Sequence, residues 1–260
     1  MKPWQSLKIA FSMYSKIPMP KTDWSPANLG YAFCFFPLIG IPIGALLAFW
    51  HFIASFLSVH PVLFASVACV IPLGVTGGIH LDGFCDTVDA LSSRQPREKK
   101  LEILKDPHTG SFAILGCISY FLLAFGFWTQ LSPAWPEIIV LGLSFVLSRS
   151  LSGLSVVTFR PAKNSGLLKT FSDAAQKQTA TIVCAILSAV CLGVMAVFSW
   201  PLSLACFVGS GLAFLYYRIM SYRQFGGITG DIAGYFLQLC ELSMLGCVTF
   251  TQLILGGTYL

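Results

Sequence analysis

The sequence carries little charge of either sign. Only 10% of its 260 residues are charged and 11 are acidic, whereas 55% are hydrophobic. A soluble domain usually has about 25% charged residues. With a mean hydropathy of +0.75, the composition excludes a soluble globular protein and predicts an integral membrane protein.

Several other patterns are missing. The nine cysteines are scattered and none forms a Cys-x-x-Cys pair, so we interpret them as small packing residues rather than ligands or disulfide partners. The N-terminal stretch "MKPWQSLKIAFSMYSKIPMPK" is interrupted by lysines and lacks the apolar core of a cleavable signal peptide. No linker, low-complexity tract or heptad array divides the chain, which predicts one membrane-embedded domain over residues 1–260.

Long apolar runs are what the sequence has instead. Helices are the default in lipid, because an open backbone there leaves polar groups unsatisfied. The predicted fold class is therefore all-α, a polytopic integral membrane helix bundle with about seven transmembrane helices. The windows long enough to cross about 30 Å of hydrocarbon are 30–58, 61–79, 111–131, 137–158, 179–199, 201–220 and 232–256.

The first 20 residues predict an additional, interfacial helix. One face with helical spacing would lie in the headgroup layer, and the lysines would stay in water. The apolar face comprises Trp4, Leu7, Phe11 and Tyr14, and the lysines are Lys2, Lys8 and Lys16.

Lysine and arginine gather in alternate loops. Four precede the first span, and the segments 80–110, 159–178 and 218–231 hold five, four and two, while the opposite loops hold none. Cationic residues near span ends stay in the cytoplasm, which predicts the N-terminus inside and the C-terminus outside. The net charge of +5 is therefore mainly a topology signal. We expect membrane lipid and no nucleic acid as a partner, and homo-oligomers remain possible.

The segment "GGIHLDGFCDTVDAL", residues 77–91, concentrates acid directly after an apolar run. If it is helical, Asp86 and Asp89 lie at about 40° and −20° from Asp82, so the three carboxylates share one face. Like charges this close require a compensating cation. Mg²⁺ is the natural partner, since it takes a few carboxylates and bridges to substrate phosphates. The alternative is a solvated acidic turn with no function.

A similar pattern recurs 149 residues later. The segment "GGITGD", residues 226–231, parallels "GGIHLD", residues 77–82, and ends in Asp231 at the start of the last span. We expect Asp231 to face the first acidic segment and to join Asp82, Asp86 and Asp89 as a metal ligand. Glycine-mediated helix packing is the alternative.

Cationic and polar residues on the same side could bind substrate phosphates. Arg149 lies inside the fourth span, where snorkelling to the interface or a structural pair with Glu241 is the alternative. Lys163 and Lys169 are more readily explained as orientation residues than as ligands. The other candidates are Lys105, Asp106, His108, Gly110 and Arg160.

Several segments together resemble cobalamin synthase, the adenosylcobinamide-GDP ribazoletransferase family of bacterial and archaeal inner membranes. They are "FSMYSKIPMP", "FCFFPLIGIPIGALLA", "GGIHLDGFCDTVDAL", "LEILKDPHTGSFAIL", "LSRSLSGLSVVTFRPAKNSGLL" and "FGGITGDIAGYFLQLCELSML". The chain departs from the family at Phe84 and Cys85, where small residues are common, and at Lys16, near which arginine is common.

The resemblance implies the last joining step of corrinoid assembly. Adenosylcobinamide-GDP would react with α-ribazole or its 5′-phosphate, giving adenosylcobalamin or its 5′-phosphate and releasing GMP, with Mg²⁺ as cofactor. Asp82, Asp86 and Asp89 would act in catalysis at the cytoplasmic face of the bacterial inner membrane. The expected substrate-binding residues are His80, Gly83, Lys105, Asp106, Arg149, Arg160, Gly226 and Gly227.

Two other functions remain open. A CDP-alcohol phosphotransferase runs related chemistry, but it requires Asp-Gly-x-x-Ala-Arg, and here Phe84, Cys85 and Asp86 follow Gly83. A secondary transporter would fit the glycine-interrupted segments in both halves. It would also favour charges near the midplane, whereas Glu137 alone among the acids lies near the outer face.

Overall fold

The computed structural model describes residues 3–132, 134–163 and 173–256, and the regular secondary structure of this part of the chain is helical apart from one isolated β-bridge. At the N-terminal end lie α1 (Pro3–Tyr14), α2 (Pro26–Leu29), α3 (Ala32–Phe35) and the 3₁₀-helix η1 (Phe36–Ile39). The long elements are α4 (Gly40–Phe56), α5 (Pro61–Thr76), α8 (Ser111–Gln130), α9 (Trp135–Thr158), α11 (Lys177–Phe198), α12 (Trp200–Gln224) and α13 (Gly230–Gly256). Between α5 and α8 lie α6 (Ile79–Ser92) and α7 (Arg97–Ile103).

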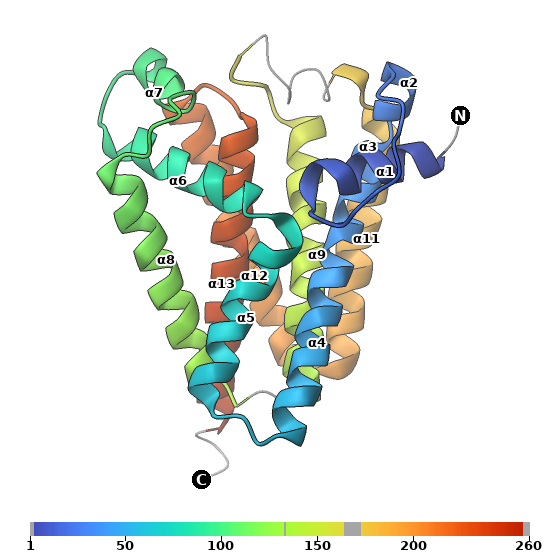
Figure 1. The fold of residues 1–260 in the computed structure, drawn as a ribbon, viewed down its shortest axis with the longest axis vertical. Helices are drawn as coiled ribbons and strands as arrows, with labels where there is room; N and C mark the ends of the chain where they lie inside the picture. Colours follow the sequence, from blue (N-terminus) through green and yellow to red (C-terminus); the bar gives the residue numbers. More distant parts are fainter. Residues whose placement is uncertain (1–2, 133, 164–172, 257–260) are drawn as a thin grey trace.

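The long helices run between two ends of a bundle, with the N-terminus at one end and the C-terminus at the other (Figure 1). Six of them are long and apolar enough to cross a membrane, and α5 with α6 forms a bent seventh candidate. This confirms the predicted all-α bundle and the approximate position of every apolar window.

The expected span 61–79 is wrong at its C-terminal end. Helix α5 ends at Thr76, and Gly77 and Gly78 have φ of 67° and 79°, the left-handed region that glycine adopts without strain. The chain bends by 100° there, so α6 lies across the end of the bundle (Figure 1). Periodicity could not reveal the angle of this bend, because helical spacing gives the face of α6 but not its direction relative to α5.

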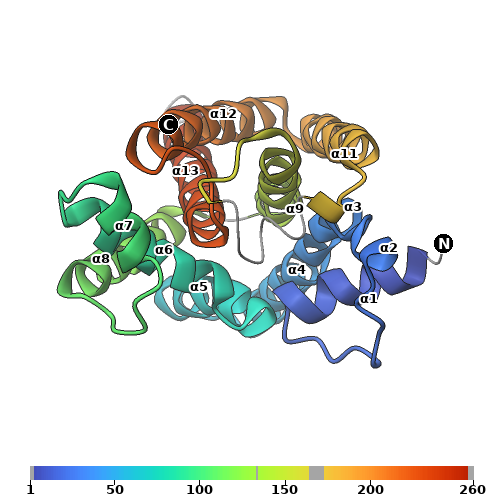
Figure 2. The same cartoon turned by 90° about the horizontal axis from the view of Figure 1, so that it is seen from above.

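Helix α9 forms the centre of the bundle. It lies between α4, α11 and α13 when the molecule is viewed from above (Figure 2), and 78% of its apolar window is buried. Gly142 and Gly44 allow α9 and α4 to approach closely, since a Cβ on Gly142 would lie 3.3 Å from Gly44 Cα. Four serine hydroxyls on α9 donate hydrogen bonds to carbonyl oxygens of the same helix. They belong to Ser144, Ser148, Ser150 and Ser155.

Helix α1 is an amphipathic helix, as expected, but one lysine lies on the wrong side. Lys8 is buried and its Nζ donates to the carbonyl oxygen of Lys21 at 3.4 Å. Trp4 is exposed and Ile9 is fully buried. The connection after α1 folds back over Lys8, which the helical periodicity could not anticipate, whereas Lys16 is exposed as predicted. Lys2 lies outside the described residues.

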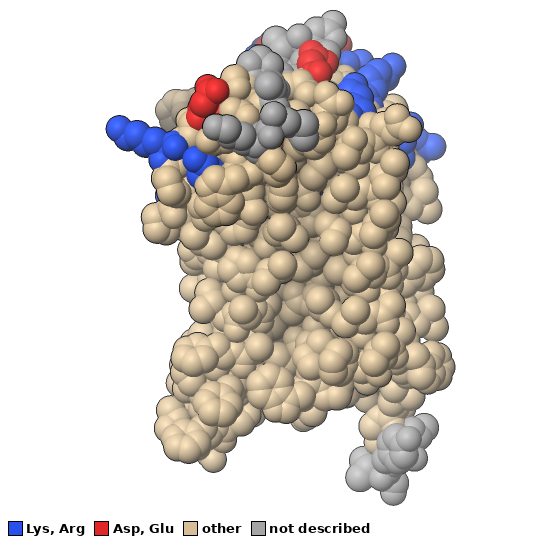
Figure 3. All heavy atoms as spheres, turned by 90° about the vertical axis from the view of Figure 1, so that its right-hand side faces the viewer, with Lys and Arg blue, Asp and Glu red and all other residues tan. Residues whose placement is uncertain are grey.

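Charged side chains gather at one end of the molecule. On the face seen in Figure 3, lysines, arginines and acids lie at the end that carries α1, while the rest of that face is uncharged. The exposed apolar residues include Phe49, Leu122, Leu212 and Ile254. This distribution fits a bundle whose sides face hydrocarbon and whose charged end faces water.

Candidate functional site

Helices α6 and α13 cross at two glycines. A Cβ on Gly83 would lie 2.8 Å from the Cα and the carbonyl oxygen of Asp231, and one on Gly234 would lie 3.0 Å from the carbonyl oxygen of His80. Any larger residue would force the helices apart. Asp231 in the first turn of α13 therefore sits against α6 beside Asp82, and the two glycine–aspartate segments meet as expected.

The carboxylates of these segments form an acidic cluster. The segment "HLDGFCDTVDAL" is helical, so the condition for a shared face is met. Asp86 lies within electrostatic range of Asp82, Asp89 and Asp231. Within the described residues, none of the three α6 aspartates forms an ion pair. The uncompensated charge makes this cluster a place where a cation is stabilised.

Asp89 differs from the other two α6 aspartates. A side chain on Gly110 would collide with its carboxylate, so Asp89 lies against the residue that precedes α8. Negative charge is favourable at a helix N-terminus. Asp89 can therefore stabilise the N-terminus of α8. Asp82, in contrast, is exposed at the surface.

The opposite side of α6 is apolar and fixes the rotation of the helix. Phe84 is buried, stacks on Tyr235 with ring centroids 5.3 Å apart and contacts Tyr120 at 5.4 Å. Cys85 lies beside Cys117. Phe84 is thus a packing residue and leaves Asp82 and Asp86 on the accessible side. Cys85 packs against Cys117 but also lies on the side of the aspartates, beside Asp82.

Two loops, residues 160–162 and 226–228, pair with each other beside the acidic cluster. The Ile228 N–H donates to the Arg160 carbonyl at 3.0 Å and the Ala162 N–H donates to the Ile228 carbonyl at 2.8 Å. The Arg160 Nε donates to the Gly226 carbonyl at 3.0 Å. Gly226 and Gly227 have φ of 75° and 156°, so glycine is required for this turn. Arg160, Gly226 and Gly227 together hold the loop that leads into Asp231.

Two lysines bring positive charge to the acidic cluster. Lys163 interacts electrostatically with Lys105 and Asp231, and its Nζ donates to the carbonyl oxygen of Leu101 at 2.6 Å. Burial and then the neighbouring Lys105 lower the pKa of Lys163, because both disfavour its charged form. A bound anion would relieve this strain. Lys169 lies outside the described residues.

The sequence analysis missed the roles of three further basic residues. The Arg97 Nη2 donates to the Ala162 carbonyl at 3.2 Å, and the Lys100 Nζ donates to Gln224 Oε1 at 2.6 Å. The Arg218 guanidinium lies 3.2 Å from the Tyr222 ring centroid. The contacts of Arg97 and Lys100 join segments far apart in the chain, so no local motif predicts them. The Arg218–Tyr222 contact has i, i+4 helical spacing, and this spacing is the signal that could have revealed it.

Asp106 and His108 lie on the exposed loop before α8. The His108 backbone N–H donates to Asp106 Oδ1 at 2.9 Å, and the ring Nδ1 lies 2.8 Å from the same oxygen. These contacts, the backbone one first, lower the pKa of Asp106. The pair closes a local turn, and the structure does not bring either side chain into the acidic cluster.

His80 lies on the inner side of α6. It is buried, and neither ring nitrogen has a hydrogen-bond partner among the described residues. Its ring centroid lies 6.0 Å from those of Tyr14 and Phe36. Because two residues along a helix differ by about 200°, His80 points away from the face that carries Asp82.

Arg149 is paired inside the bundle. It is 1% exposed, and its Nη1 donates to Glu241 Oε1 at 2.7 Å and to the Phe145 carbonyl at 2.9 Å. The Ser148 hydroxyl lies 3.0 Å from the same glutamate oxygen and can donate to it in place of the Phe145 carbonyl. This is the structural pairing that the sequence left open, and it is favoured over direct binding of substrate.

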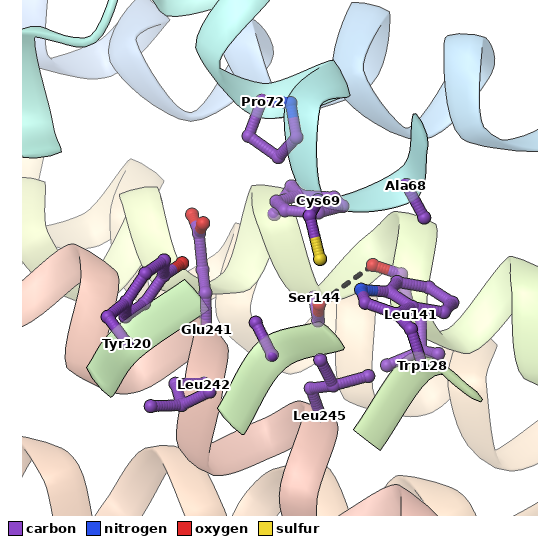
Figure 4. A pocket seen from close by; sticks show the side chains of 12 residues that line it. Ala68, Cys69, Pro72, Tyr120, Trp128, Leu141, Ser144, Glu241, Leu242 and Leu245 are labelled. Atoms are coloured by element: carbon purple, nitrogen blue, oxygen red, sulfur yellow. Dashed lines mark hydrogen bonds between the residues drawn. The ribbon is translucent and has the colours of Figure 1, made fainter. Parts of the chain in front are cut away.

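Glu241 borders a small internal cavity. Figure 4 shows Tyr120 and Glu241 near each other, with Cys69 and Ser144 on another side of the cavity. Its volume of about 40 Å³ leaves room for roughly one or two water molecules. The cavity is too small for a nucleotide or corrinoid.

Open space lies instead at the bend between α5 and α6, at Gly77 and Gly78, which we call the elbow. A cleft of about 380 Å³ is lined there by six residues, of which Asp82 is the one charged member. The lining residues are Gly77, Gly78, Ile79, Leu81, Asp82 and Cys85. The accessible chemistry of the site therefore lies around Asp82.

The acidic cluster is not a preformed metal cage. Among the described residues, no group of three or more histidine, cysteine or acidic side chains is arranged to hold a metal ion. Mg²⁺ commonly binds through one or two carboxylates together with substrate phosphates. The residues present thus fit a magnesium ion that arrives with a diphosphate, and they do not fit a closed structural metal site.

Comparison with known proteins gives a consistent result. The family described as Cobalamin-5-phosphate synthase matches residues 6–249. An adenosylcobinamide-GDP ribazoletransferase of Lachnoclostridium phytofermentans is 45% identical over 99% of this chain and 98% of its own length. Enzymes of the same name from Clostridium perfringens and Fusobacterium nucleatum are each 32% identical, over 92% and 90% of this chain and 95% and 93% of their own lengths. No solved structure matches the chain.

Proposed function

The chain belongs to the Cobalamin-5-phosphate synthase family, and from this premise we propose how its acidic cluster carries out the family's reaction. The enzyme is an adenosylcobinamide-GDP ribazoletransferase of cobalamin biosynthesis. It joins adenosylcobinamide-GDP to α-ribazole or its 5′-phosphate and forms adenosylcobalamin or its 5′-phosphate, with release of GMP.

The reaction is a phosphoryl substitution. A ribose hydroxyl of α-ribazole attacks the phosphorus attached to cobinamide, and a new P–O bond forms. The bond from this phosphorus to the bridging oxygen breaks, GMP leaves with the electron pair, and the hydroxyl proton passes to a base. The protein must therefore accept one proton and stabilise the negative charge of the departing phosphate.

The α6 carboxylates are the groups suited to the first task. Asp82 is exposed beside the cleft and Asp86 lies one turn further along the same face, so either can accept the hydroxyl proton. Asp82, Asp86 and Asp231 would hold Mg²⁺ together with the diphosphate, and Asp89 on α6 supports the cluster by its contact with Gly110, the residue before α8. Bound there, magnesium would supply charge neutralisation at the diphosphate.

The lysines are suited to the second task. Lys105 and Lys163 lie close enough to repel one another, and Lys163 also interacts with Asp231. A phosphate between the two lysines would replace repulsion with attraction. Arg160 and the glycine turn at 226–227 keep this side of the site in position.

The site would face the cytoplasm of a bacterial cell. The lysines and arginines outside the spans lie in the N-terminal segment and in the segments 80–110, 159–178 and 218–231. This distribution favours an N-terminus inside and a C-terminus outside the inner membrane. Both substrates are charged or strongly polar, so an aqueous compartment is the natural source for them.

The single observation that supports this assignment most strongly is the glycine-permitted contact of Gly83 with Asp231, since it joins the two acidic segments of the sequence into one site. The test is release of GMP from adenosylcobinamide-GDP by the purified protein in detergent, with α-ribazole present. A transferase releases GMP without a closed compartment. Absence of GMP release in detergent, with accumulation of the intact substrate in sealed vesicles, would favour the transporter alternative.

A further inference from the structure

A groove outside the catalytic site runs between α4 and α5. It has a volume of about 690 Å³ and is lined by residues of both helices and of the connection that follows α1. Leu46 and Val70 in its walls are 46% and 57% exposed. Since α4 and α5 lie at the side of the bundle (Figure 1), the groove opens toward hydrocarbon rather than water.

The polarity of the groove is confined to one end. Ser66 lines it, but its hydroxyl donates to the Val62 carbonyl at 2.8 Å and is satisfied within α5. Lys16 lines the end nearest the charged face, is exposed, and forms no side-chain hydrogen bond or ion pair with the described residues. An apolar channel with one free cation at its water-facing end complements a lipid tail with an anionic headgroup.

The position of Lys16 is fixed by the fold. Its backbone N–H donates to the Val75 carbonyl at 2.7 Å, in the last turn of α5. Its side chain passes over Gly77, where a Cβ would lie 2.8 Å from Lys16 Cγ. The lysine is therefore attached to the same elbow that turns the chain into α6 and Asp82.

We propose that this groove is a specific binding site for an anionic phospholipid. One acyl chain lies between α4 and α5, and the phosphate pairs with Lys16. From Ser66 to Val75 the groove follows α5 for about 14 Å, which suits part of an acyl chain. The bound lipid contacts both the connection after α1 and α5, holds the two together at the α5–α6 elbow, and thereby stabilises the orientation of α6. The lipid site itself does not depend on the catalytic assignment.

The experiment uses the full-length protein in nanodiscs of phosphatidylcholine and in nanodiscs that also contain phosphatidylglycerol. The readouts are lipid retained in native mass spectrometry and the thermal unfolding midpoint. Phosphatidylglycerol is expected to be retained preferentially and to raise the midpoint. Inorganic phosphate added to phosphatidylcholine nanodiscs is expected to have no such effect, because it lacks the acyl chain.

Two independent variants test the headgroup and the tail. Lys16→Gln should weaken phosphatidylglycerol retention about fivefold, while Lys21→Gln, an exposed lysine outside the groove, should not. Gly74→Leu should block the groove, because a side chain at Gly74 meets open space within it. Gly126→Leu on α8 is the matched control, since it also meets open space.

The proposal is overturned if Lys16→Gln and Lys21→Gln retain phosphatidylglycerol equally, or if Gly74→Leu and Gly126→Leu do. It is also overturned if inorganic phosphate reproduces the effect of the lipid. Loss of turnover by Lys16→Gln with unchanged lipid retention would assign the lysine to substrate binding instead.

Discussion

Asp82, Asp86 and Asp231 carry most of the chemistry that the site can perform. Their positions follow from a helix face that the sequence predicts and from a glycine contact that it only suggests. The spacing of three aspartates over eight residues defines one face of α6 whatever the tertiary structure. Which other charges meet that face depends on how α6 crosses α13 and on where the loop with Lys163 lies, and the sequence does not determine either. The contacts of Arg97 and Lys100 were missed for the same reason, since they join segments far apart in the chain.

Neutralising an acidic residue of the cluster should impair turnover and its response to metal. Asp82→Asn, Asp86→Asn and Asp231→Asn are each expected to lower kcat by roughly 10²–10³-fold, the effect of losing one group that stabilises transition-state charge. Each should also raise the Mg²⁺ concentration needed for half-maximal GMP release. Asp106→Asn is the control, because Asp106 is engaged in a local turn with His108.

The metal-site assignment would be wrong if the three cluster variants kept the wild-type Mg²⁺ requirement. A loss of kcat at saturating Mg²⁺ with an unchanged requirement would leave the aspartates as bases or binding groups without a metal role.

The buried Arg149–Glu241 pair should contribute to stability rather than to chemistry. Arg149→Met and Glu241→Met should each lower the free energy of unfolding by roughly 3–5 kcal/mol, since each leaves one buried charge unpaired. The double variant should regain much of this loss, because an apolar pair needs no compensation. Thermal unfolding in detergent and GMP release per folded protein measure the two effects. A double variant with restored stability and no turnover would show that Arg149 contacts substrate.

At the scale of elements, the elbow at residues 77–78 determines where the acidic residues lie. The sequence predicts the helices well because apolar periodicity persists over many residues. It does not predict the 100° bend, because α6 is itself apolar on its inner face through Phe84 and Ala90. The burial of Lys8 was missed for a related reason, since it depends on the path of the loop that follows α1.

The contact of α6 with α13 can be tested at Gly83. Gly83→Ala places a Cβ 2.8 Å from the Asp231 backbone, so α6 must move away by a fraction of an ångström or more. Displacement of about 1 Å commonly costs 10²-fold in rate, and we expect kcat/KM to fall by about tenfold or more. Gly126→Ala is the matched control, because its new methyl group meets open space. Equal activity of the two variants would show that the position of Asp231 against Gly83 does not matter for the reaction.

At the scale of the whole molecule, the arrangement of charge predicts the orientation in the membrane. In a variant without the native cysteines, Gln95→Cys and Gln224→Cys should react with an impermeant thiol reagent only when the cytoplasmic side is accessible. Ser132→Cys, at the opposite end of the bundle, should react from the periplasmic side. The reverse pattern would overturn the positive-inside interpretation.

The central claim is that the substrate diphosphate binds between the acidic cluster and the two lysines. The most direct measurement is a structure of the protein with Mg²⁺ and a non-reactive analogue of adenosylcobinamide-GDP. The account predicts the diphosphate beside Asp82 and Asp231, with Lys105 and Lys163 on its other side. A diphosphate bound elsewhere, with no atom near α6 or the start of α13, would contradict it.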